Sequence, residues 1–141
     1  MKLSCLLFSV PVLITLHVTS SCTKEKQTQT YALITADTAI AVNGNITITE
    51  KTKSEVQAKV HIQDLWMYEG ELLNNHIHEG NYPNAVGAVK YDFGKQKVTN
   101  GEVNATLTVP LSFAEFKNFD AVFVIHKPDN VLYLATVEIG K

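Results

Sequence analysis

The sequence contains no arginine, and all 12 of its basic residues are lysines. The planar guanidinium group of arginine is the usual device for clamping or steering small anions, so its absence disfavours enzymes that act on such substrates. The formal net charge is only −2, which leaves no basic footprint for nucleic acid. The composition therefore predicts that the chain does not bind nucleic acid.

Several sequence signatures of common enzyme classes are also missing. There is no glycine-rich phosphate loop, no Ser/His/Asp nucleophile signature, no 30-residue βαβ pattern and no internal repeat. What is present is a chain of 141 residues, 45% hydrophobic and 18% charged, which is typical of one globular domain.

Cysteine is scarce, and its placement is informative. Lys2 and an apolar run over residues 3–18 precede the small residues 19–21, as in a signal peptide, so residues 1–21 are expected to be removed together with Cys5. Cys22 follows directly and is left without a partner for an intrachain disulfide. The arrangement resembles a bacterial lipoprotein signal, in which this cysteine is lipidated, although Thr19 stands where that family favours leucine. Ordinary secretory cleavage nearby is the alternative.

Residues 22–30 are polar and lack apolar periodicity, which predicts a flexible tether between a lipid anchor and the domain. The folded domain is then expected to span residues 31–141. This organisation predicts a protein of the cell envelope, anchored to a bacterial membrane through its N-terminal lipid, on the periplasmic or the surface side.

The domain reads as a series of short β-strands. Residues 56–62 and 103–109 alternate strictly between apolar and polar side chains, which indicates strands with one face in a core. Asn-Gly pairs at residues 43–44 and 100–101 predict hairpin turns. Further strands are expected over 31–42, 46–49, 76–78, 89–93, 121–126 and 131–139, with Gly94 ending the strand over 89–93.

Two segments break this pattern. Residues 65–75, which contain Trp66 and Tyr68, are expected to form a loop with a buried aromatic plug. Residues 112–119 predict the one short helix, because Ser112 and Glu115 have the spacing of a capping box. Roughly eight strands at this spacing predict an all-β fold, a single antiparallel β-sandwich.

Histidines supply the candidate site. His76 and His78 point to the same face of an extended strand, with Cα atoms about 7 Å apart, close enough to reach one metal ion. His126, which closes the apolar run over 121–125, is a candidate third ligand. Imidazole suits Cu and Zn. His61 falls on the water-facing side of its strand and is expected to bind no metal.

The residues around these histidines carry a family resemblance. Residues 75–80 (NHIHEG), with 86–89 following, resemble the HIHxG segment of the CHRD domain and the HxHE copper-ligand strand of Cu/Zn superoxide dismutases. Residues 124–129 (VIHKPD) look like the dismutase segment that carries a later copper histidine, and 134–140 look like its final strand. The resemblance implies a superoxide dismutase-like Greek-key β-sandwich over about residues 31–141.

By that resemblance, His76, His78 and His126 match three of the four copper ligands. Asp129 matches an aspartate that orients ligand imidazoles. The chain departs from the dismutases in lacking the zinc loop, the disulfide and the guiding arginine, in whose place Tyr133 stands. These departures bring it closer to CHRD domains.

Three functions remain open. The first is a non-catalytic envelope module that binds one Cu or Zn ion or an envelope protein partner. The second is a copper-dependent dismutase without a zinc site, for which Lys127 is the only nearby substitute for the guiding arginine. The third is a structural or adhesive domain in which the histidines are only hydrogen-bonded. Glu71 and Glu79 are expected to be solvated, although either could supply an oxygen ligand.

Overall fold

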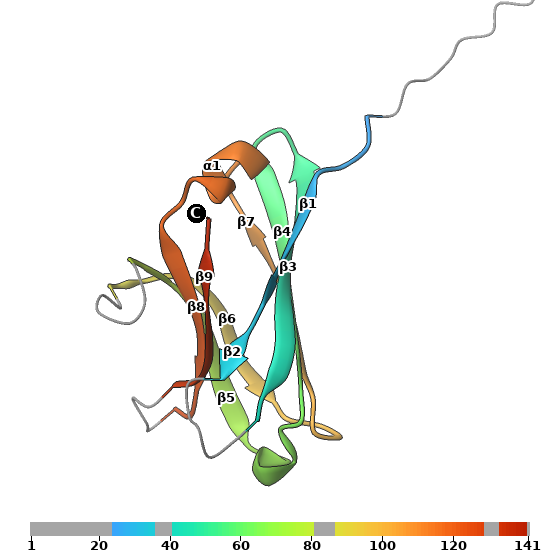
Figure 1. Cartoon of the computed structure of the whole chain (residues 1–141), viewed down its shortest axis with the longest axis vertical. Coiled ribbons are helices and arrows are strands. Elements are labelled where there is room, and N and C mark those ends of the chain that lie inside the picture. The colour runs from blue at the N-terminus through green and yellow to red at the C-terminus, as the bar shows by residue number, and fades with distance from the viewer. Residues whose placement is uncertain (1–23, 36–40, 81–86, 129–132, 141) are drawn as a thin grey trace, which may run out of the picture.

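Two antiparallel sheets pack face to face in the computed structural model, which describes residues 24–35, 41–80, 87–128 and 133–140. The predicted all-β sandwich is confirmed (Figure 1). Cys22, Asp129 and the expected signal peptide over residues 1–21 lie outside the described residues.

The four-stranded sheet has the order β1 (Thr28–Ala32), β3 (Asn43–Thr52), β4 (Glu55–Gln63) and β7 (Val103–Val109). The five-stranded sheet has the order β2 (Ile34–Thr35), β9 (Tyr133–Ile139), β8 (Ala121–His126), β5 (Leu72–Glu79) and β6 (Val89–Lys97).

The connections between the sheets follow a Greek-key path. The β5–β6 hairpin lies in the five-stranded sheet, the chain crosses to β7 in the four-stranded sheet, and β8 then returns to pair with β5. This return of a later strand to lie beside the first strand of a hairpin is the Greek-key arrangement. It places the sequence segment around His126 next to the segment around His76, although about 50 residues separate them.

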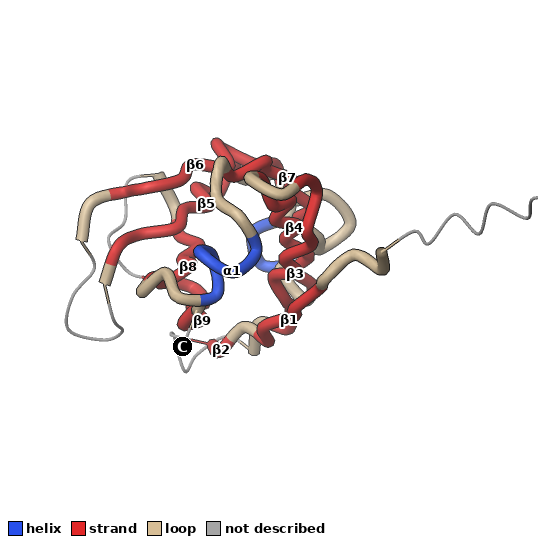
Figure 2. Tube along the Cα trace, turned by 90° about the horizontal axis from the view of Figure 1, so that it is seen from above, coloured by secondary structure: helices blue, strands red, loops and turns tan. Residues whose placement is uncertain are grey.

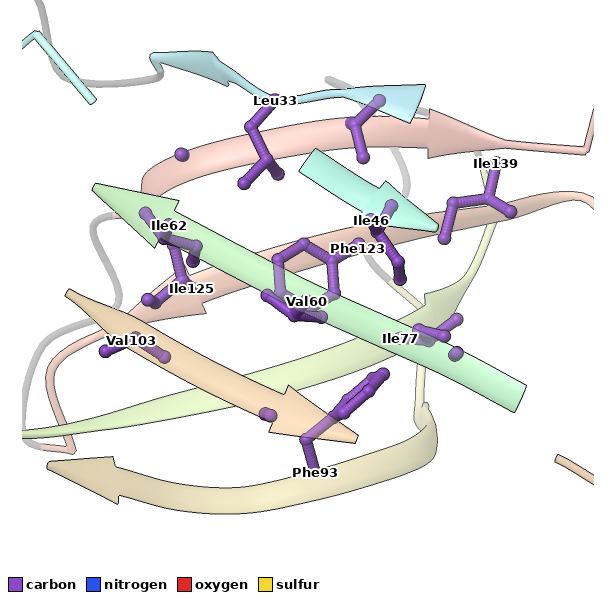
Figure 3. Packing of buried hydrophobic residues seen from close by; sticks show 14 of the residues in the cluster. Leu33, Ile46, Val60, Ile62, Ile77, Phe93, Val103, Phe123, Ile125 and Ile139 are labelled. Atoms are coloured by element: carbon purple, nitrogen blue, oxygen red, sulfur yellow. The ribbon is translucent and has the colours of Figure 1, made fainter. Parts of the chain in front are cut away.

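The core lies between the sheets and consists of the inward residues that the alternation predicts. Val56, Ala58, Val60 and Ile62 of β4 are all buried. They face the apolar inner side of the other sheet, including Phe93 and Phe123, whose rings meet edge to face with centroids 5.8 Å apart (Figure 3). Such aromatic pairs contribute about 0.5–1.5 kcal/mol beyond the burial of their surface.

The predicted helix is present as α1 (Phe113–Lys117), and it covers one end of the sandwich (Figure 2). Ser112 accepts a hydrogen bond from the Glu115 N–H, and the Glu115 carboxylate accepts one from the Ser112 N–H. This is the capping box that the sequence predicts. Phe113 and Phe116 of α1 are buried in the core. No helix in the described ranges is long and apolar enough to cross a membrane.

Two expectations about the first strands are wrong. β1 begins at Thr28 and pairs with β3, so residues 28–30 belong to the sheet and not to the tether. Asn43 and Gly44 form no turn, because they lie inside β3 opposite Gln63 and Ile62. A Cβ on Gly44 would come within 2.6 Å of the His61 carbonyl oxygen, so glycine is needed there for close approach of the strands.

The expected buried aromatic plug is formed by Tyr68 and not by Trp66. Trp66 lies on the short 3₁₀ helix Trp66–Tyr68 with 65% of its surface exposed, while Tyr68 is buried. The indole of Trp66 lies against the turn at Asn100 and Gly101, where both residues have positive φ angles. That turn is confirmed, and its paired positive φ angles explain the Asn-Gly sequence.

Candidate metal centre

The three candidate histidines lie on the outer face of the five-stranded sheet. In β5, Ile77 points into the core, and His76 and His78 therefore point to the opposite face. His126 ends β8 and pairs with Asn74 of β5. Asn74 lies two residues before His76 on the same face of the strand, so His126 lies diagonally across from His76. The ring centroid of His76 is 5.6 Å from that of His78 and 5.3 Å from that of His126. The ring of His76 therefore lies beside the rings of both His78 and His126, and a shared metal site remains a prediction.

The two centroid distances can be compared with those expected for imidazoles that bind one ion. A metal–nitrogen bond of about 2.0–2.1 Å puts each ring centroid about 3.2 Å from the metal. Two rings at a tetrahedral or trigonal angle would then have centroids roughly 5.2–5.5 Å apart, which is close to both observed values. As the side chains stand, no group of three or more His, Cys, Asp or Glu residues in the described part of the chain is already arranged to hold a metal ion. The rings would thus have to rotate before their nitrogens could meet at one point.

Hydrogen bonds to backbone carbonyls fix the protons of two rings. His78 Nδ1 lies 2.9 Å from the Gly87 carbonyl oxygen, and His126 Nδ1 lies 2.7 Å from the Lys127 carbonyl oxygen. A carbonyl oxygen only accepts, so both Nδ1 atoms donate and the lone pair of each neutral ring lies on Nε2. His78 Nε2 is buried and has no hydrogen-bond partner. This is the protonation pattern of histidines that bind a metal through Nε2.

His76 has the opposite arrangement. Its Nε2 lies 3.3 Å from Asp92 Oδ1, and its Nδ1 is buried without a hydrogen-bond partner. Burial lowers the pKa of His76; the Asp92 carboxylate opposes this shift, and the neighbouring His126 and His78 rings add to it. The ring is therefore neutral at pH 7 and can offer a lone pair to a cation.

Apolar side chains border the histidines on the same face. Val124 stands across from His76 and Val122 across from His78, and both valines are fully buried. Thr136 of β9, which is opposite Val124, is 2% exposed. Water is thus kept from one side of the site, which strengthens electrostatic interactions within it.

The charged residues near the site are largely paired. The ammonium group of Lys127 binds the Glu71 carboxylate, with Nζ 2.9 Å from Oε2, and lies over the Tyr68 ring. Glu79 binds Lys90 at 2.7 Å. Lys127 is therefore paired with Glu71, which disfavours a role for its charge in guiding an anion to the histidines.

The remaining candidates resolve as follows. His61 lies on the outer face of the other sheet, where its ring nitrogens contact Asn104 and Gln63, as expected for a residue outside the site. Asp129 lies outside the described residues. Asp92 was missed by sequence reasoning. Its only signal is that the alternation of Val89, Tyr91 and Phe93 puts it on the outer face of its strand.

Comparison with known proteins adds no family to this geometry. Neither a scan of protein-family models nor a search of curated proteins finds a match to the chain.

Proposed function

We propose that the chain is a cell-envelope lipoprotein whose CHRD-like domain binds one Cu or Zn ion through His76, His78 and His126, without catalysing a reaction. The observation that carries the proposal is a pair of buried ring nitrogens, His76 Nδ1 and His78 Nε2, that have no hydrogen-bond partner. Buried polar atoms without a partner cost about 1–3 kcal/mol each, so folds rarely retain them without a use. A metal ion would satisfy both.

The donor set fits these two metals. Three neutral imidazoles with one open position are an established zinc arrangement, and imidazole nitrogen is also a preferred ligand of copper. No sulfur ligand is needed, and Glu71 and Glu79 are each engaged by a lysine. When bound, the ion would join β5 to β8 through side chains and leave a coordination position for water or for a group of an envelope partner.

The electrostatics favour a cation over a small anion as the species that enters. The Asp92 side chain is 59% exposed and stands beside the ring of His76, whereas Lys127 is held by Glu71. An exposed carboxylate beside the histidines attracts metal cations and repels superoxide. This is the main physical argument against the dismutase alternative, together with the absence of arginine.

The test is equilibrium dialysis of the purified protein against Cu or Zn, followed by elemental analysis. We expect one ion per chain in the wild type and a strong loss of binding in His76→Ala, His78→Ala and His126→Ala. His61→Ala is the matched control and should bind normally. If the wild type retains neither metal, the structural alternative replaces this proposal. A superoxide dismutation rate near the diffusional ceiling of about 10⁹ M⁻¹s⁻¹ in the copper-loaded protein would favour the dismutase instead.

The lipoprotein part of the proposal has its own test. It rests on the apolar run ending at Ser20, Ser21 and Cys22, with a polar segment after it. The mature protein should partition with membranes, and Cys22→Ser should release it or leave the precursor uncleaved. An intact mass showing an unlipidated N-terminus would contradict this part alone.

A further inference from the structure

We propose that β1 is an interaction edge at which a second copy of the chain adds its own β1, so that the two four-stranded sheets join into one. This pairing is independent of the metal site and goes beyond the proposed function. The strand Thr28–Ala32 stands at the margin of the four-stranded sheet (Figure 2). Among the described strands it pairs with β3 alone.

Two hydrogen bonds at the ends of β1 show which of its backbone groups bond to β3. The Leu33 N–H donates to the Gly44 carbonyl oxygen at 2.9 Å, and the Glu50 N–H donates to the Gln27 carbonyl oxygen at 2.8 Å. In an antiparallel pair, the backbone groups of alternate residues point toward the partner strand. Every second residue from Gln27 to Leu33 therefore bonds to β3.

The residues in between present their backbone to solvent. These are Thr28, Thr30 and Ala32, whose N–H and C=O groups point away from β3 by the same alternation. All three residues are exposed. The margin of β1 is therefore a row of backbone donors and acceptors that is open to another strand.

Edge strands are normally protected against such pairing, and β1 lacks the usual protection. The edge strand β6 continues past Gly94, where the sequence predicts its end, to Lys97. It carries lysines at 90, 95 and 97, and its register with β5 shifts beside Gly94, which has a φ of +76°. The edge strand β7 lies beside β6 of the other sheet, and β2 has two residues. The sequence of β1, TQTYA, contains no charge, proline or glycine.

The open edge is complementary to itself, which identifies the partner as a second copy. Thr30 lies midway between Thr28 and Ala32, so a two-fold axis at Thr30 sets this residue against Thr30 of the second copy. The same axis sets Thr28 against Ala32. Every outward N–H and C=O group of the three residues then meets a partner. An axis at Gln29 or Tyr31 would leave one end of the edge unpaired within β1.

The side chains around the edge suit this pairing. On the outer face, Thr30 Oγ1 lies 3.0 Å from Thr47 Oγ1, and Thr28 Oγ1 lies 3.4 Å from Thr49 Oγ1. Two facing Thr30 side chains would continue this row of hydroxyl groups across the two-fold axis, and cross-strand threonine pairs stabilise sheets. Ile34 directly follows the edge and is 65% exposed, so an apolar side chain borders the surface that the second copy would cover.

The experiment exchanges charges at the residue that faces itself. Thr30→Lys and Thr30→Glu should each lose dimerisation, because like charges would stand directly opposite each other. An equimolar mixture of the two variants should recover it, because opposite charges then face. Thr106→Glu, on the outer face of β7 at the other edge of the same sheet, is the matched control and should dimerise like the wild type.

The readouts are the dimer fraction and the protection of backbone amides. Sedimentation velocity of the purified wild-type protein should show a shift from monomer to dimer as concentration rises, and a short edge is expected to associate weakly. In the dimer, hydrogen exchange at Thr28, Thr30 and Ala32 should slow. Exchange at Gln29 and Tyr31 should change little, because their N–H groups already bond to β3.

Three results would overturn the inference. The first is a wild-type protein that stays monomeric at every concentration, whichever other protein it binds. The second is a dimer in which the amides of Thr28, Thr30 and Ala32 remain unprotected. The third is a mixture of Thr30→Lys and Thr30→Glu that stays monomeric although both variants are folded by circular dichroism. All three leave the proposed metal site standing, since its histidines lie on the other sheet.

Discussion

Replacing His76 with leucine should stabilise the metal-free protein while abolishing metal binding. The substitution removes a buried Nδ1 that has no partner, which is worth about 1–3 kcal/mol. It also removes the contact with Asp92, but the Asp92 side chain is 59% exposed, and such surface pairs contribute about 0–1 kcal/mol. Leucine would extend the apolar surface of Val122 and Val124. The balance is a gain of roughly 1–2 kcal/mol in the free energy of unfolding.

The assay is urea denaturation of chelator-treated protein, with an unchanged m-value showing that both proteins unfold in the same way. His78→Leu provides a matched comparison. It removes the unpartnered Nε2 but also the hydrogen bond to the Gly87 carbonyl, so its stability should be close to that of the wild type. If His76→Leu destabilises the protein by more than about 1 kcal/mol, the ring is a packing element with satisfied polar atoms, and the reasoning for a metal site fails.

Three further predictions concern the metal, pH and a turn. Zinc or copper at a hundredfold excess over Kd should add about 2.7 kcal/mol of stability, which is a rise in Tm of roughly 5–15 °C by differential scanning fluorimetry. His61→Ala should keep the full rise, and no rise in the wild type would contradict binding. Because burial lowers the pKa of His76, the unfolded chain takes up a proton at higher pH than the folded one. The metal-free protein should therefore lose stability as pH falls from 7 to 5. If a His76→Leu variant loses as much stability over this pH range as the wild type, protonation of His76 is not the cause. Gly101→Ala should destabilise the protein more than Gly70→Ala. Both glycines have positive φ, but only a Cβ at Gly101 would meet the Trp66 ring, at 2.7 Å. Equal losses of unfolding free energy in urea titrations would contradict the packing of Trp66.

Local signals in the sequence were sufficient for much of the fold. Strict alternation identifies β4 and β7, because side chains of a half-buried strand must alternate between core and water. The capping box at Ser112 and the turn at Asn100 and Gly101 involve only neighbouring residues, and both are as predicted. The shared face of His76 and His78 follows from strand geometry alone.

What the sequence could not supply depends on contacts between distant segments. An Asn-Gly pair has the same local signature in a turn and in a strand, and only the approach of the His61 carbonyl explains Gly44 inside β3. The contact between Asp92 and His76 depends on a register shift in a hairpin, which no local pattern specifies. The position of His126 came from a family resemblance and not from periodicity. The fold places it beside His76 through the Greek-key return of β8.

The burial of β8 on both faces has a consequence for how quickly a metal ion could leave. This strand is hydrogen-bonded to β5 on one side and to β9 on the other, and Ala121 to Ile125 are all buried. Its amide protons should therefore exchange only when the whole domain opens. Release of an ion through local opening of the strands would be as slow as global unfolding. The faster route is rotation of the His76 ring, whose side chain is 15% exposed, so the lifetime of the complex would be set by one side chain.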